Sequence, residues 1–224
     1  RHQKIVEESP SPALTPALRE RMAAAAVAAA RAAEYVNAGT VEFLLEGSGD
    51  AARFYVLEVN ARLQVEHPVT EAVTGVDLVR AQIEVASGGR LRWRQSDLSQ
   101  RGHAIECRIY AEDPLQDFLP QAGRLLLYRE PSMPGVRVDS GVMEETEVPV
   151  YYDPLVAKLI AWGETRDAAL TRAAEALGSF GLLGVRTNLA FLIEILGHPR
   201  FRAGEADTGF LDREMAALRE RLAA

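Results

Sequence analysis

The sequence has few of the features that mark secreted, membrane-spanning or nucleic-acid-binding proteins. Its 224 residues include a single cysteine, Cys107, which excludes an internal disulfide and favours a reducing compartment. No apolar run approaches the length of a membrane span. Acidic residues outnumber basic ones, and the net charge of -7 argues against a broad nucleic-acid footprint. We therefore expect a cytoplasmic protein that binds neither membranes nor nucleic acid.

The composition is otherwise that of an ordinary globular protein. Hydrophobic residues make up 48% of the chain and charged residues 25%, and the length suffices for one large core or two small ones. The sequence contains no internal repeat. A polar connection, Arg90–Gln100, follows the pair Gly88-Gly89 and marks a change in pattern. We therefore predict two domains, over residues 1–98 and 99–224.

The most informative stretch is Phe54–Pro68, which reads FYVLEVNARLQVEHP. Its first half alternates as a strand does, and this alternation puts Glu58 and Asn60 on one face. The period-two series of polar residues continues with Arg62, Gln64 and Glu66, and Pro68 ends it. Carboxylate and amide oxygens suit magnesium, and a guanidinium beside them suits a small anion. The alternative is that these residues are simply the wet face of an edge strand.

A partner strand is predicted just upstream. Residues 39–46 have a strand pattern, Gly47-Ser48-Gly49-Asp50 is a turn, and the chain returns at Arg53, which together predict a hairpin. Antiparallel partners on one face can bring Glu42 and Glu58 to a common metal, whose charge removes their repulsion. Leu44 shares the face of Glu42, and core packing is the alternative role for it.

Helices are predicted on both sides of this hairpin. Thr15-Pro16 has the hydroxyl and the proline typical of a helix start, so we expect a helix over Leu18–Val36 with Gly39 in its C-terminal cap. Helical spacing returns over Val69–Ala86, where Gly75 predicts a break between two short helices.

Beyond the predicted boundary the pattern is rich in strands. The segment His103–Tyr110 alternates and puts Glu106 and Arg108 on one face, where they could form a buried salt bridge. His103 is expected to pack or hydrogen-bond in the core. Further strands are predicted at residues 124–129, 135–141 and 155–162, and helices at 166–180, 188–196 and 208–222.

Several separated motifs together resemble the biotin carboxylases, which are members of the ATP-grasp superfamily. The motifs are RHQK at the start, GTVEFL, EVNARLQVEHPVTE, RGHAIECRIYAEDP, GVRVDSG, YYDPLVAKLI and GVRTNLAFL. The resemblance covers nearly the whole chain. It implies an α/β (α+β) fold, in which the C-terminal half of an ATP-grasp domain precedes a biotin carboxylase C-terminal domain. The family also has an upstream region, so we expect this sequence to be a fragment.

The resemblance implies MgATP-dependent carboxylation of biotin by bicarbonate by way of carboxyphosphate. The positions that match the family's Mg²⁺ (or Mn²⁺) ligands are Glu42, Glu58 and Asn60. By the same match, Arg62 would hold bicarbonate, Glu66 would be the general base, and Arg108 would stabilise the enolate of biotin. Matching substrate or cofactor contacts are His2 against ATP, Lys4 near bicarbonate, Leu44 against adenine, Gln64, the backbone N–H of Val65, and Thr208. For His2 and Lys4 the alternative is a solvated basic terminus.

The resemblance also implies partners. The biotin-attachment motif Met-Lys-Met is absent from the sequence, so biotin would come from a separate carrier domain or subunit, which would pass carboxyl groups to a carboxyltransferase. The family implies a homodimer for the intact enzyme. Two alternatives remain open, namely an ATP-grasp ligase for a different carboxylate and a non-catalytic assembly fragment. Because the sequence lacks a glycine-rich phosphate-covering loop and the family's upstream lysines, we expect the isolated chain to be catalytically silent.

Overall fold

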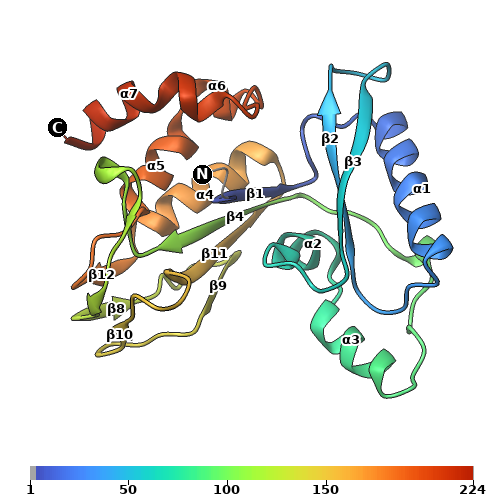
Figure 1. The fold of residues 1–224 in the computed structure, drawn as a ribbon, viewed down its shortest axis with the longest axis horizontal. Helices are drawn as coiled ribbons and strands as arrows, with labels where there is room; N and C mark the ends of the chain where they lie inside the picture. Colours follow the sequence, from blue (N-terminus) through green and yellow to red (C-terminus); the bar gives the residue numbers. More distant parts are fainter. Residues whose placement is uncertain (1–3, 224) are drawn as a thin grey trace. The chain divides into compact units, whose positions relative to one another are not determined.

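The computed structural model describes residues 4–223, and its mixture of helices and strands forms two compact units (Figure 1). The hairpin unit comprises residues 10–101, and the sheet unit comprises residues 4–9 and 102–223. Among these described residues, none of the helices combines the length and the apolarity needed to cross a membrane.

The hairpin unit begins with helix α1, Pro16–Ala32. The predicted start is confirmed, because the Thr15 side chain accepts a hydrogen bond from the Leu18 N–H at 3.2 Å. The helix ends earlier than predicted, since the backbone turns to positive φ at Glu34 and Asn37. Gly39 is therefore not part of its cap. A Cβ atom at Gly39 would lie 2.8 Å from Cε1 of Tyr35, so this glycine permits a close approach of the Tyr35 ring instead.

The predicted hairpin is confirmed and consists of β2, Thr40–Glu46, and β3, Arg53–Asn60. Figure 1 shows the two strands side by side next to α1. The rings of Phe43 and Phe54 meet edge to face at 5.4 Å, and Arg21 of α1 lies over the Phe54 ring. These contacts anchor one face of the hairpin on the helix and leave the opposite face for Glu42.

A bulge at Leu57 changes which residues of β3 share that face. Glu42 pairs with Glu58, but the next residue of β2 pairs with Val56, so Leu57 is skipped. Leu44 then pairs with Tyr55. Uninterrupted alternation would put Val56 on the face of Glu58, whereas below the bulge Tyr55 lies on that face.

Two short helices follow, as the glycine break predicted. They are α2, His67–Thr74, and α3, Leu78–Ala86. Gly75 caps α2 with a φ of 72°, and Asp77 caps α3 by accepting from the Arg80 N–H at 2.8 Å. Pro68 does not end a strand-like segment. It lies buried in the first turn of α2, where a helix needs no N–H. A 3-10 turn, η1, Gln95–Asp97, lies in the predicted polar connection.

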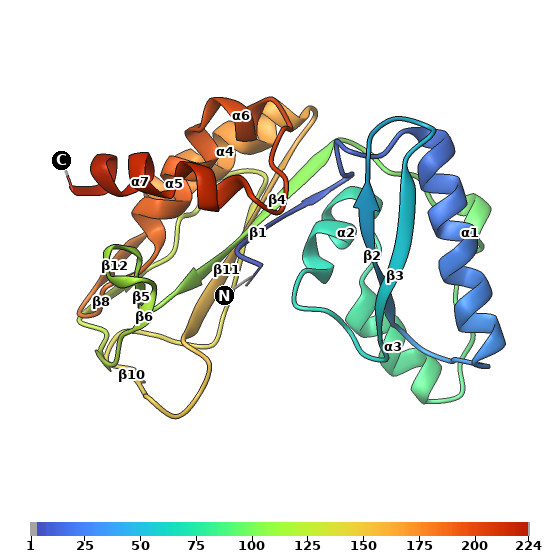
Figure 2. The same cartoon turned by 45° about the horizontal axis from the view of Figure 1, so that its top comes forward.

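The sheet unit is built on a four-stranded antiparallel sheet with the order β1-β4-β11-β9. Its strands are β1, Val6–Ser9; β4, His103–Tyr110; β11, Leu155–Gly163; and β9, Val136–Ser140. The helices α4, Arg166–Gly178, and α5, Leu189–Gly197, lie on one side of this sheet (Figure 2). Two further helices, α6, Pro199–Arg202, and α7, Phe210–Ala223, lie on the same side. The core forms between them, from buried residues that include Ile105, Cys107, Leu159 and Leu170.

Smaller elements complete the sheet unit. They are β5, Glu112–Asp113; η2, Pro114–Gln116; β6, Leu119–Pro120; β7, Gly123–Arg124; β8, Leu127–Arg129; β10, Glu147–Val148; β12, Gly181–Leu183; α6, Pro199–Arg202; and α7, Phe210–Ala223. The single strand predicted at 124–129 is split into β7 and β8. The chain changes partners there, because Leu125 bonds to Thr146 and Leu126 bonds to Leu183.

Candidate functional site

Asn60 joins two facing carboxylates on the hairpin. Glu42 of β2 stands directly opposite Glu58 of β3. The Asn60 amide Nδ2 donates to Glu42 Oε1 at 3.2 Å and to Glu58 Oε1 at 2.8 Å. The side chains of these three residues therefore converge, as the cross-strand pattern predicted.

The network continues into the loop after β3. The buried side chain of Gln64 donates from Nε2 to Glu42 Oε1 at 3.1 Å, and its Oε1 accepts from Arg62 Nη1 at 2.9 Å. Arg62 also donates from Nη2 to Asn60 Oδ1 at 3.3 Å. These bonds form a closed ring in which every polar side chain restrains the next. The guanidinium is thus held beside the two carboxylates.

The donor set of the hairpin fits a magnesium ion. Within residues 4–223, no group of three or more His, Cys, Asp or Glu side chains gathers. The hairpin offers two carboxylates and an amide oxygen, all of them hard ligands. Mg²⁺ prefers such incomplete sites, because it retains waters and binds substrate phosphates. Glu42, Glu58 and Asn60 are therefore the residues that could hold it.

The predicted anion-handling residues lead into a helix N-terminus. Val65 and Glu66 are half-buried, and Glu66 occupies the N-cap position of α2. His67 Nδ1 lies 2.7 Å from the Gln64 carbonyl oxygen and stabilises the turn between them. The N-terminal end of a helix carries partial positive charge, which favours an anion near Val65. Leu44 lies on β2 with its side chain 51% exposed, so it is not a core residue of this unit.

Arg108 lies in the sheet unit, near the end of β4. Its Nη2 atom is 2.6 Å from Oε1 of Glu7, and both side chains are at most 10% exposed. The alternative salt bridge considered above joined Arg108 to Glu106, which is fully buried on the same strand. The structure also forms an ion pair between Arg108 and Glu7 of β1. The sequence pattern missed Glu7, because its role depends on the pairing of two strands far apart in the chain.

A row of charged residues crosses the same face of the sheet. Lys158 of β11 stands opposite Arg108, and Asp139 of β9 stands opposite Lys158 at an Nζ to Oδ2 distance of 3.5 Å. Arg137 donates to both oxygens of Asp139, at 2.6 and 2.8 Å. Burial alone would raise the pKa of Asp139, but the bonds from Arg137 and the charge of Lys158 outweigh it and hold that pKa below its ordinary value.

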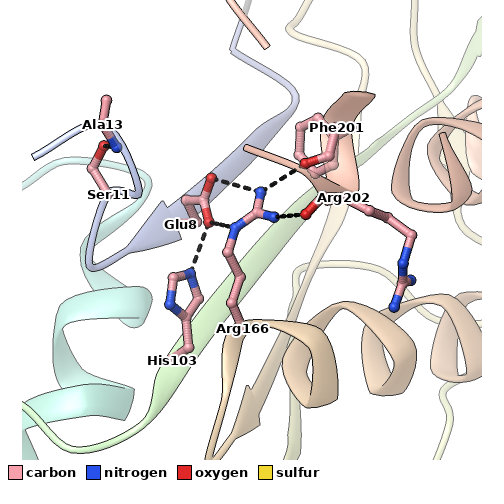
Figure 3. Close-up of polar contacts among 7 residues, drawn as sticks. All are labelled: Glu8, Ser11, Ala13, His103, Arg166, Phe201 and Arg202. Atoms are coloured by element: carbon pink, nitrogen blue, oxygen red, sulfur yellow. Dashed lines mark hydrogen bonds and ion pairs between the residues drawn. The ribbon is translucent and has the colours of Figure 1, made fainter. Parts of the chain in front are cut away.

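His103 has the structural role that the sequence predicted. Its Nε2 atom lies 2.7 Å from Oε2 of Glu8, and Arg166 donates to both oxygens of Glu8 (Figure 3). Burial alone would raise the pKa of Glu8. Hydrogen bonds from His103 and Arg166 outweigh it and hold that pKa below its ordinary value.

The remaining candidates are dispersed. Lys4 is exposed just before β1, and Thr208 is exposed in the turn before α7. His2 lies outside the described residues. The structure thus assembles one group of candidates on the hairpin unit and places Arg108, Lys4 and Thr208 in the sheet unit.

Two family models match the chain. The first is the carbamoyl-phosphate synthase L chain ATP-binding domain, which matches residues 1–94, and the second is the biotin carboxylase C-terminal domain, which matches residues 106–213. The fold and these matches therefore define a class of chain that joins part of an ATP-binding domain to a biotin carboxylase C-terminal domain. More specifically, the chain belongs to the biotin carboxylase family.

Known relatives match nearly the whole chain. A pyruvate carboxylase subunit from Methanothermobacter thermautotrophicus is 55% identical over 212 residues, which are 95% of this chain and 42% of the relative. Biotin carboxylase from Nostoc sp. is 51% identical, with 94% of this chain and 46% of the relative covered. The biotin carboxylase domain of 2-oxoglutarate carboxylase from Hydrogenobacter thermophilus, solved as a dimer with MgADP and bicarbonate, superposes with a TM-score of 0.92 at 41% identity. The match covers 97% of this chain and 47% of that one. The chain spans less than half the length of these proteins.

Proposed function

We propose that the chain forms the C-terminal part of an MgATP-dependent biotin carboxylase, which carboxylates biotin with bicarbonate by way of carboxyphosphate. The observation that carries this proposal is the ring of hydrogen bonds that joins Glu42, Glu58 and Asn60 to Gln64 and Arg62. It joins three side chains that could serve as magnesium ligands to a guanidinium that could bind an anion. This is the combination needed to bring a metal-bound phosphate next to a small carboxylate substrate.

On this proposal the hairpin holds the metal of MgATP. Glu42 and Glu58 would provide carboxylate oxygens, and Asn60 would provide its amide oxygen to Mg²⁺ or Mn²⁺. Such an ion neutralises phosphate charge during transfer. The exposed side chain of Leu44 on β2 would offer an apolar surface to the adenine.

Bicarbonate would lie at the start of α2. The Arg62 guanidinium would bind its oxygens, with Gln64 alongside and the backbone N–H of Val65 as a further donor. Glu66 would take the bicarbonate proton, so that the oxygen becomes a competent nucleophile. The solved relative from Hydrogenobacter thermophilus that contains bicarbonate and MgADP supports this pairing of ligands in the family.

Arg108 would act on biotin rather than on bicarbonate. Its side chain is buried, and an arginine remains cationic in such surroundings. It could therefore stabilise the negative charge that develops on the ureido oxygen of biotin. Lys4 and Thr208 remain proposed contacts to bicarbonate and nucleotide.

The proposed enzyme needs partners. Biotin would be presented by a separate carboxyl carrier domain or subunit, and a carboxyltransferase would use the product. The intact protein is proposed to be a cytoplasmic homodimer, and the dimer of the Hydrogenobacter thermophilus relative supports that state. The division into an ATP-grasp part over residues 1–98 and a C-terminal domain over 99–224 belongs to the same proposal.

The test is the substrate dependence of ATP cleavage in a complete enzyme that contains this sequence. We expect cleavage to require Mg²⁺ and bicarbonate, and product formation to require biotin. The rival function, a ligase for a different carboxylate, predicts ATP cleavage that responds to that carboxylate and is indifferent to biotin. Cleavage without bicarbonate would contradict the proposed function.

A further inference from the structure

The ion pair between Arg108 and Glu7 is unusually well buried for two charged side chains. Arg108 Nη2 lies 2.6 Å from Glu7 Oε1, and the side chains of Arg108 and Glu7 are 10% and 9% exposed. A buried cation is costly unless a carboxylate compensates its charge. The hydroxyl of Tyr110 also bonds to Arg108. Glu7 and Tyr110 therefore restrain the guanidinium, from β1 and β4 respectively.

Glu7 reaches Arg108 only because β1 is paired in one register. Glu7 stands opposite Glu106, and the Arg108 N–H donates to the Ile5 carbonyl at 2.9 Å. The strand has four residues and lies at the edge of the sheet. A slip of one residue would move Glu7 to the opposite face and remove it from Arg108.

The next residue, Glu8, fixes that register from the opposite face. Its carboxylate accepts from Arg166 at 2.7 and 3.1 Å and contacts His103 at 2.7 Å. Arg166 in turn donates to the carbonyl oxygens of Arg202 and Phe201, at 2.7 and 3.0 Å. Figure 3 shows this cluster, in which Arg166 ties β1 to the start of α4 and to α6. The short edge strand is thus fastened to the helical layer.

We propose that Glu7 is a positioning residue for Arg108, and that the Glu8–Arg166 clamp on the other face of β1 holds Glu7 in place. The inference rests on the proposed role of Arg108 toward biotin. An arginine has five N–H donors in a rigid fork, so a carboxylate on one edge fixes the direction of the others. Glu7 also compensates the charge of Arg108 until the substrate oxygen becomes negative.

The test uses steady-state kinetics of Glu7→Gln in a complete enzyme, with free biotin as the substrate. The amide keeps the shape of the side chain but loses its charge. We expect the KM for biotin to rise about tenfold or more, while the KM for MgATP changes less than about twofold. The variant Glu147→Gln alters an exposed carboxylate of β10 and serves as the control with unchanged values. An unchanged KM for biotin in Glu7→Gln overturns the proposal.

A double variant separates positioning from general destabilisation. If Glu7 acts only through Arg108, Glu7→Gln combined with Arg108→Gln should carboxylate biotin no worse than Arg108→Gln alone. Additive losses would mean that Glu7 acts independently of Arg108, and the inference would fall. The single variant Arg108→Gln also tests the proposed function by itself. If it carboxylates biotin normally, the role of Arg108 is wrong, whatever Glu7→Gln does.

Discussion

Asn60 is the residue on which the hairpin network depends. Its amide nitrogen donates to both facing carboxylates, and its carbonyl oxygen accepts from Arg62. With a metal in place, the amide would have to present its oxygen instead. The network therefore holds the three side chains together, and the Asn60 amide would turn when an ion binds.

The first prediction concerns the metal ligands. Glu58→Gln in a complete enzyme removes one anionic ligand and should strongly raise the Mg²⁺ concentration needed for ATP cleavage. Titration of ATP cleavage with Mg²⁺ measures this. The control is Glu46→Gln, because Glu46 is exposed on the same hairpin and pairs with Arg53 outside the network. Normal magnesium dependence in Glu58→Gln would falsify the assignment.

The second prediction separates Glu66 from Arg108. Glu66→Gln should abolish bicarbonate-dependent ATP cleavage even without biotin, because the proton acceptor is lost. Arg108→Ala should spare that cleavage but slow biotin carboxylation by about 10²-fold, the scale of one lost oxyanion donor. The two assays are run on both variants. Equal effects of both variants in both assays would contradict this division of labour.

The third prediction concerns the pH dependence of stability. The pKa of Glu8 is lowered below its ordinary value of 4.5 by His103 and Arg166, whose hydrogen bonds outweigh the opposite effect of burial. The ionised Glu8 therefore contributes fully to the free energy of unfolding above pH 4.5. This contribution is lost as the pH falls through the pKa that Glu8 has in the folded protein, which is lower. Urea unfolding of this chain at several pH values below 6 should show that decline, and Glu8→Gln should make it shallower. If the free energy of unfolding of Glu8→Gln falls equally steeply with pH, groups other than Glu8 cause the decline.

At the scale of elements, the hairpin unit depends on the anchoring of α1. This helix is rich in alanine and buries Leu18 alone among its described residues, so it has little apolar surface with which to pack. Its N-terminal cap and the contact of Arg21 with the Phe54 ring consequently matter more than they would in a well-buried helix. Thr15 also donates to the Asp50 side chain in the hairpin turn, at 2.5 Å.

The fourth prediction follows from that cap. Thr15→Ala removes the acceptor for the Leu18 N–H and should lower the free energy of unfolding of the hairpin unit by about 1 kcal/mol. Thermal unfolding followed by circular dichroism would detect this as a lower melting temperature. Thr15→Ser keeps the hydroxyl and should retain most of the stability. If alanine and serine at this position behave alike, the cap contributes nothing.

At the scale of the whole molecule, the candidate catalytic groups are divided between two compact units. The metal and bicarbonate candidates belong to the hairpin unit, and Arg108 belongs to the sheet unit. The chain also spans less than half the length of its relatives, one of which was solved with MgADP bound. Phosphoryl transfer depends mainly on positioning and charge stabilisation, so a site built from part of the residues loses most of the catalysis.

The fifth prediction is that the isolated chain folds but is catalytically silent. Isothermal titration with MgATP should show weak binding at best. The isolated chain lacks the upstream lysines that, by the family resemblance, would contact the phosphates. An assay with free biotin and bicarbonate should detect no carboxylation. A complete biotin carboxylase is the positive control. Turnover by the isolated chain near that of the complete enzyme would show that these residues suffice alone.

The sequence by itself determined those features that arise from neighbouring residues. The hairpin with Glu42 opposite Glu58, the start of α1 at Thr15 and the break at Gly75 were all predictable, because turn and cap residues act on the backbone next to them. Gln64 and Arg62 also join the hairpin network, as their place directly after the strand indicated. The motifs further indicated the family before any coordinates were considered.

Only the tertiary structure decided which distant groups meet. Glu7 and Arg108 are about a hundred residues apart, and no local pattern specifies that β1 pairs with β4 in the register that joins them. The bulge at Leu57 and the division of residues 124–129 into two strands depend on their partner strands in the same way. The packing of the whole core sets which remote strands pair. The free energy of a buried ion pair, or of the hydrogen bonds between two strands, is gained only after the chain has closed the loop between the two segments.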